Sequence, residues 1–149
     1  ESIGLCAPNL NSHRRYLGPL VPTTRAWGHN NRSVAFRVPA AQGQARRVEH
    51  RVAGADASPH MVVAVVLASV LHGITQRLTA TEPVTGRVKR PEQQDFPVGA
   101  LAALARTQDS PLLSRYFPER FLKLFAELKQ KEHAAVMEGI FPVEYDFYL

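Results

Sequence analysis

Two short stretches of the chain alternate between apolar and polar residues, SVAFRVP at 33–39 and RRVEHRV at 46–52. Because successive side chains of a β-strand point to opposite faces, this period of two predicts two strands. QGQ at 42–44 fits a turn, so the two strands could pair as a hairpin. In the second strand the alternation predicts three charged side chains on one face: Arg47, Glu49 and Arg51.

The rest of the chain shows helical patterns. An apolar helix is predicted at 59–78, with Ser58 or Asp56 as its N-cap and Pro59 in its first turn. It is apolar nearly all round, which predicts deep burial. Further elements are expected as a short helical turn near 11–15, helices at 98–108 and 110–117, and a long amphipathic helix at 118–139. Helices that follow strands, without alternating with them, are typical of an α+β fold.

The length and composition narrow the class of protein. A chain of 149 residues, 45% of them hydrophobic, fits one globular domain or part of one. With a single cysteine, Cys6, the chain cannot form an internal disulfide. We expect Cys6 to be a small, partly buried residue of a protein in a reducing compartment. The N-terminus lacks a signal-peptide layout, and the longest apolar run is too short to span a bilayer. We therefore expect a cytoplasmic protein with no membrane partner.

The positive charge is concentrated in residues 1–51. This third of the chain holds eight arginines, no lysine and two acids, a formal charge of +6, whereas the remainder carries −1. Arginine used to the exclusion of lysine favours planar, bidentate recognition of carboxylate or phosphate. A nucleic-acid patch is less favoured, because such patches usually combine lysine with arginine and exposed aromatic side chains.

The trio on the second strand has two interpretations. It could be a solvent-exposed charge ladder, or it could be an anion site, since Glu49 is the only acid near so many arginines. Glu49 itself could pair with its neighbours or bind Mg²⁺, which prefers carboxylate and phosphate oxygens. Arginines, a carboxylate and a metal together are typical of phosphoryl-transfer sites.

Several linked motifs resemble a known family. NSHRR at 11–15, AWGHNNRSVAFRVP at 26–39, ARRVEHR at 45–51 and the helix opened by ASPH resemble, in order and spacing, the catalytic domain of glutamine synthetases. HRVAGADASPHMVVAVVLASVLHGI and the final VEYDFYL are similar to the γ-glutamylpolyamine synthetase branch, which includes γ-glutamylputrescine synthetases. The family fold implies a curved antiparallel sheet backed by helices.

The resemblance also implies an activity. Family members use ATP to phosphorylate the γ-carboxylate of glutamate, and ammonia or an amine then displaces the phosphate. By position, Arg15 and Arg51 resemble the arginines that bind glutamate. Arg32 resembles the one that steadies the transferring phosphate. Arg37 and Arg47 resemble arginines near the ATP phosphates.

For Glu49 the resemblance implies a ligand to a divalent metal, Mg²⁺ or Mn²⁺. Two positions depart from the family pattern. Leu20 lies near the place where ammonia-using members carry an acid that guards the site, so the loop favours a bulkier amine such as putrescine, unless it has simply drifted. Gln44 stands where a lysine is often found. Ordinary glutamine synthetase and a non-catalytic remnant are the alternative readings.

The resemblance covers residues 1–149 as the C-terminal part of the catalytic domain. The N-terminal β-grasp domain and the first half of the catalytic domain, with the other metal ligands, are absent from this chain. We therefore expect the chain alone to be inactive, because one carboxylate does not hold the two or more metals needed. The resemblance implies that the full-length parent assembles as a homo-oligomer of stacked hexameric rings.

Overall fold

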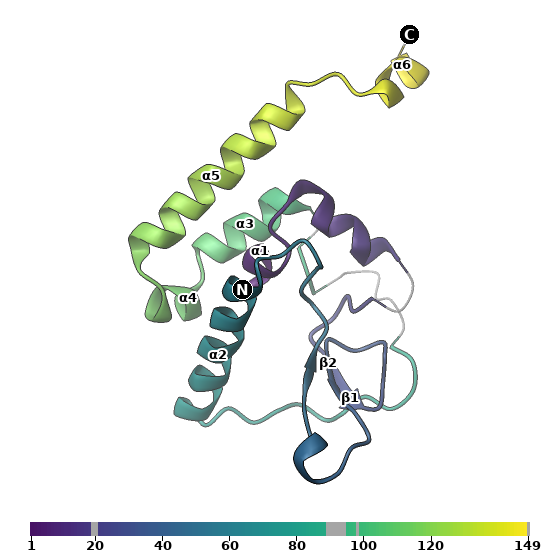
Figure 1. The fold of residues 1–149 in the computed structure, drawn as a ribbon, viewed down its shortest axis with the longest axis vertical. Helices are drawn as coiled ribbons and strands as arrows, with labels where there is room; N and C mark the ends of the chain where they lie inside the picture. The colour runs from purple at the N-terminus through teal and green to yellow at the C-terminus, as the bar shows by residue number, and fades with distance from the viewer. Residues whose placement is uncertain (19–20, 89–94, 98, 149) are drawn as a thin grey trace.

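A computed structural model describes residues 1–18, 21–88, 95–97 and 99–148. Figure 1 shows α2 to α5 gathered on one side of the molecule and the strands on the other, which confirms the α+β fold class. The elements in chain order are α1 (Ile3–Cys6), the 3₁₀ helix η1 (Leu10–Leu17), β1 (Trp27–His29), β2 (Phe36–Val38), the 3₁₀ helix η2 (Gly43–Ala45), β3 (Glu49–His50), α2 (Pro59–Thr75), α3 (Ala100–Gln108), α4 (Pro111–Tyr116), α5 (Glu119–Met137) and α6 (Pro142–Tyr148).

The three strands form one sheet in the order β1–β2–β3. β2 and β3 are antiparallel, as the possible hairpin and the resemblance both implied, with Arg37 opposite Glu49. β1 runs parallel to β2, which departs from the wholly antiparallel sheet that the resemblance implied. After β1 the chain turns at Asn30, whose φ of 48° is a left-handed conformation that asparagine tolerates. It then returns to the start of β1, where the N–H groups of Ala35 and Phe36 donate to the Ala26 carbonyl.

The core lies between α1 and the other helices. Every residue of α1 is buried, and the backbone N–H of Gly4 donates to Thr107 Oγ1 of α3 at 3.0 Å. A Cβ at Gly4 would lie 2.6 Å from that oxygen, so glycine permits the close approach of the two helices. The buried cluster also contains residues of η1, of the chain next to β2 and β3, and of α2, α4 and α5: Tyr16, Ala35, Val52, Val65, Leu113 and Leu122.

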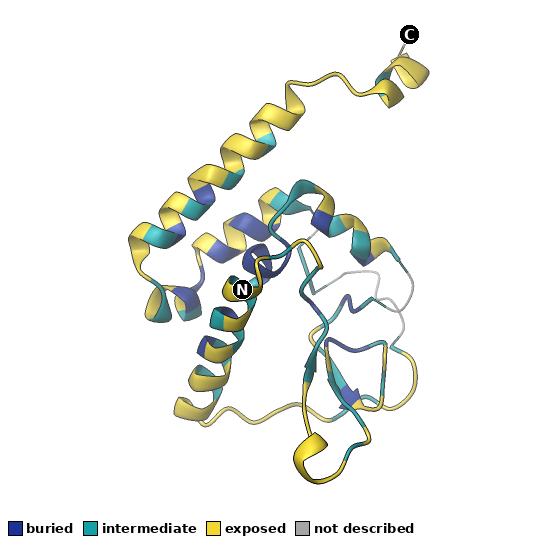
Figure 2. Cartoon of the chain, in the orientation of Figure 1, coloured by how far each residue is buried: buried dark blue, intermediate teal, exposed yellow. Residues whose placement is uncertain are grey.

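The apolar helix α2 is not deeply buried, so that prediction was wrong. Within it only Val65 and Ala68 are buried, whereas Leu67 is 63% and Ile74 71% exposed. Figure 2 shows long exposed stretches along α2 and along α5. The helix packs mainly on α1 and α4, and β3 is not among its main partners in the described part of the chain. When a helix is apolar on every face, its sequence does not show which face packs against the rest of the protein.

Most helix boundaries agree with the predicted ones within two residues. Ser58 is the N-cap of α2, and Pro59 is its first residue, as expected. α2 ends at Thr75, three residues earlier than predicted, before Arg77 adopts φ 51°. The sequence reading missed α1, β1 and α6. None of the described helices is long and apolar enough to cross a membrane.

Candidate functional site

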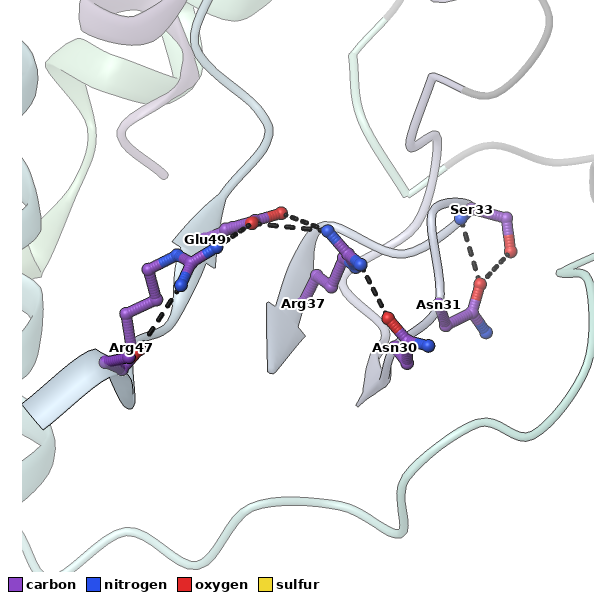
Figure 3. Close-up of polar contacts among 7 residues, drawn as sticks. Asn30, Asn31, Ser33, Arg37, Arg47 and Glu49 are labelled. Atoms are coloured by element: carbon purple, nitrogen blue, oxygen red, sulfur yellow. Dashed lines mark hydrogen bonds and ion pairs between the residues drawn. The ribbon is translucent and has the colours of Figure 1, made fainter. Parts of the chain in front are cut away.

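The site is built on the pairing of β2 with β3. Arg37 Nη1 donates to both carboxylate oxygens of Glu49, at 3.2 Å to Oε1 and 3.0 Å to Oε2 (Figure 3). Arg37 Nη2 donates to Asn30 Oδ1 at 2.6 Å, so the turn after β1 also holds the guanidinium. Residues that are directly opposite in an antiparallel pair share a face, which is why this ion pair forms.

Arg47 approaches Glu49 from the same strand segment. Its Nη2 lies 3.5 Å from Glu49 Oε1, and its Nη1 donates to the backbone carbonyl of Ala45 at 3.2 Å. The pKa of Glu49 is lowered, chiefly by the hydrogen bond from Arg37 and further by the positive charges of Arg47 and Arg51. Arg47 and Arg51 of the predicted trio therefore both act on the charge of Glu49, and Arg37 of β2 adds a third arginine to this cluster.

Arg32 stands apart from this carboxylate. It is exposed and lines a pocket of about 560 Å³ beside Arg37. The pocket is lined by His29, Asn30, Asn31, Arg32, Ser33, Arg37, Gly86 and Arg87. No acid occurs among these described lining residues, so the pocket is suited to an anion. Arg87 was missed by the sequence reading, because it lies in the part of the chain whose net charge is slightly negative.

Arg15 of η1 contacts the chain that directly follows β3. Its guanidinium donates to the backbone carbonyls of Val52 and Arg51, with Nη2 3.4 Å from the Arg51 oxygen. The hydroxyl of Tyr16 donates to the same Val52 carbonyl at 2.9 Å. These contacts attach η1 to the chain that follows β3 and place the Arg15 guanidinium against the backbone of Arg51. Their contact with a substrate carboxylate stays a prediction.

A second attachment of η1 passes through Asp56. Ser12 Oγ donates to Asp56 Oδ2 at 2.5 Å, and Asn9 Nδ2 donates to the same oxygen at 3.1 Å. Lys129 of α5 donates to Asn9 Oδ1 at 3.0 Å, so the network reaches the long helix. Desolvation acts to raise the pKa of Asp56, but the hydrogen bonds from Ser12 and Asn9 outweigh it, and the pKa is lowered. Asp56 is therefore an acceptor that holds η1 in place.

The described residues do not form a complete metal site. Among them no three histidine, cysteine, aspartate or glutamate side chains gather in one cluster. Glu49 could supply a single carboxylate ligand, and in this structure both of its oxygens accept hydrogen bonds from Arg37. We therefore derive no metal-dependent step from this chain. The prediction about Leu20 lies outside the described residues.

Comparisons with known proteins agree on one family. The family model described as glutamine synthetase, catalytic domain, matches residues 1–148. The γ-glutamylputrescine synthetase PuuA of Escherichia coli K12 is 43% identical over 133 residues, which cover 89% of this chain and 28% of that protein. The glutamine synthetase of Methanocaldococcus jannaschii is 30% identical over 139 residues, which cover 87% of this chain and 31% of that protein.

Solved structures show the same fold. A structure of GmaS in its apo form, without ligand, superposes with a TM-score of 0.80 at 22% identity, over 99% of this chain and 34% of that one. At this identity the likeness concerns the fold alone. The chain thus spans less than a third of the two curated relatives named above, at 28% and 31% of their lengths.

Proposed function

The chain belongs to the glutamine synthetase catalytic-domain family, and from this we propose that the protein containing it is an ATP-dependent ligase that joins the γ-carboxylate of glutamate to an amine. Family membership confirms the resemblance read from the motifs. The observation that carries the proposal is the arrangement of Arg37, Glu49 and Arg47 beside the Arg32 pocket, whose described lining residues include no acid. Arginine clusters of this kind bind phosphate and carboxylate groups.

In this proposal one set of arginines binds ATP and another set binds glutamate. Arg32, Arg37 and Arg47 bind the phosphates of ATP, and Arg15 and Arg51 bind the carboxylates of glutamate. A γ-carboxylate oxygen attacks the terminal phosphorus, and ADP leaves, which gives γ-glutamyl phosphate. The amine then attacks the carbonyl carbon, and inorganic phosphate departs while the nitrogen loses a proton. Positive side chains around the transferring group stabilise its charge in the transition state.

Glu49 contacts Arg37 and Arg47 directly, and the positive charge of Arg51 also lowers its pKa. When a divalent metal is bound, it supplies further positive charge on the phosphate oxygens. Glu49 is proposed as one ligand of Mg²⁺ or Mn²⁺; the described residues gather no metal-binding cluster around it, and in this proposal the remaining ligands come from the rest of the protein. On this basis we expect the chain alone to lack activity. Assembly into stacked rings and a cytoplasmic location stay predictions as well.

The amine is proposed to be putrescine or another polyamine. Identity to the E. coli γ-glutamylputrescine synthetase is 43%, against 30% for the archaeal glutamine synthetase. The loop at 16–24 contains no acidic residue that could accept a proton from ammonium. An apolar loop suits a carbon-bearing amine better than a small cation. The second candidate, glutamate–ammonia ligase, is favoured by the match to glutamine synthetases.

The test uses the complete protein that contains this chain. Phosphate release is measured with ATP, Mg²⁺ and glutamate, in the presence of putrescine, spermidine, ethanolamine or ammonium. We expect kcat/KM to be highest for one of the polyamines. A higher kcat/KM for ammonium would replace the proposed substrate with the second candidate. The absence of release with every amine would identify a non-catalytic remnant.

A further inference from the structure

The segment 84–88 is attached along the edge of β1. The backbone N–H of Val84 donates to the carbonyl of Trp27 at 2.8 Å. Gly28 faces this contact, and a Cβ there would lie 2.5 Å from the Val84 oxygen. A larger residue at Gly28 would therefore push the segment away from the strand. The sequence separation between the two is more than 50 residues, so the contact depends on the whole fold.

Asn31 fastens the same segment to the turn after β1. Its Nδ2 donates to the carbonyls of Val84 at 3.2 Å and Gly86 at 2.7 Å. Its Oδ1 accepts from the backbone N–H of Ser33 at 2.9 Å and from the Ser33 hydroxyl at 2.7 Å, as Figure 3 shows. The N–H of Val88 donates to Ser33 Oγ at 2.9 Å. Asn31 and Ser33 therefore hold the segment on both sides of residue 87.

This attachment places Arg87 on the rim of the pocket that Arg32 and Arg37 also line. Gly86 adopts φ 78°, the left-handed conformation in which glycine is favoured, so the chain turns immediately before Arg87. Glu49 neutralises Arg37, but no acid lines the pocket near Arg32 and Arg87 in the described part of the chain. Two like charges held at one pocket favour an anion between them.

We propose that Arg87 is a phosphate-binding residue, which contacts the polyphosphate chain of ATP together with Arg32. This inference rests on the proposed function for the identity of the anion. Neither the family motifs read from the sequence nor the strand alternation includes Arg87. Its position depends on Asn31, whose amide nitrogen and oxygen are both engaged in holding the segment.

The experiment measures binding directly, with the complete protein in Mg²⁺ buffer and isothermal titration calorimetry. The probes are ATP and inorganic tripolyphosphate, since the second lacks the base and sugar. We expect Arg87→Ala to weaken binding of both by about tenfold, the scale of one lost charge-assisted hydrogen bond at an exposed site. Arg87→Lys should retain part of the affinity. The matched control Arg115→Ala, on α4 away from the sheet (Figure 1), should bind as wild type does.

The variant Asn31→Ala distinguishes a residue that positions Arg87 from a residue that contacts the anion. It should weaken both probes, and the double variant with Arg87→Ala should bind no worse than Arg87→Ala alone, because the two act through one contact. The inference is overturned if Arg87→Ala binds both probes as wild type does, or if wild type binds neither. The ligase assay is separate: a protein that binds polyphosphate through Arg87 but joins no amine to glutamate contradicts the proposed function only.

Discussion

Arg37 and Glu49 face each other across β2 and β3, and one guanidinium nitrogen lies within 3.2 Å of both carboxylate oxygens. Their side chains are only 16% and 30% exposed, respectively. Because the pair depends on strand register, a slip of one residue would place an apolar side chain of β2 opposite Glu49. The electrostatics of the site and the register of this small sheet are therefore coupled.

The first prediction concerns the pH dependence of stability. The pKa of Glu49 lies below its ordinary value of 4.5, because Arg37 donates to the charged form. Its contribution is then complete above the unfolded-state pKa and is lost as the pH falls through the lower folded-state value. We expect wild type to be more stable than Glu49→Gln at neutral pH and the difference to vanish in acid. Urea denaturation across the acid range measures it, and a difference that does not change with pH contradicts the prediction.

Local periodicity was enough to place part of the site. Alternation put Arg47, Glu49 and Arg51 on one face, since a period of two is a property of any strand. It also put Arg37 on the face opposite Phe36, as the register now shows. The pairing itself could not be derived with certainty, because residues 39–48 carry no diagnostic hairpin turn and instead form a longer link that contains η2.

The remaining features depend on contacts that are distant in sequence. Arg87 lines the pocket beside Arg32 because Trp27, Asn31 and Ser33, more than 50 positions earlier, hold the segment around it. Asp56 was read as a possible helix cap, whereas it accepts hydrogen bonds from Ser12 and Asn9. No pattern of period two or 3.6 encodes such contacts. Composition alone would have placed every candidate site arginine in the first third of the chain.

The second prediction tests Asp56 as a positioning residue. Asp56→Ala removes the acceptor for Ser12 and Asn9, so η1 should loosen against the chain after β3. We expect a loss of about 1 kcal/mol of stability, at the low end for charged hydrogen bonds because Asp56 is exposed. In the complete protein, KM for glutamate should rise more than kcat falls, since Arg15 is carried by η1.

The control for this variant is Asp146→Ala, which removes an exposed aspartate of α6. It should leave both stability and KM unchanged. Equal changes in KM for glutamate and for ATP in Asp56→Ala would instead indicate a general loss of structure.

The third prediction compares two glycines within helices. At Gly4 an added Cβ would lie 2.6 Å from Thr107 Oγ1 and 3.2 Å from the Ala103 carbonyl oxygen, so Gly4→Ala must separate α1 from α3. We expect a loss of about 1–3 kcal/mol, as for other overpacked cores. At Gly73 of α2 no described atom outside the neighbouring backbone of the helix lies within 4 Å of such a Cβ. Gly73→Ala should therefore stabilise the chain by about 0.5–1 kcal/mol.

Chemical denaturation of both variants beside wild type measures these opposite signs. If Gly4→Ala were as stable as wild type, the close packing of α1 on α3 described above would be incorrect. A loss of stability in Gly73→Ala would show that another segment of the protein packs against α2 at Gly73.

The fourth prediction concerns the thiol of Cys6. It is 1% exposed, and burial raises its pKa to about 11. Because the thiolate is the reactive form, alkylation by iodoacetamide near pH 8 should be slow in the folded protein and fast after denaturation. Mass spectrometry of the peptide that contains Cys6 measures both rates. Cys6→Ser should also cost more stability than Cys6→Ala, since it buries a hydroxyl among apolar neighbours. Equal alkylation rates in native and denatured protein would contradict the burial of this side chain.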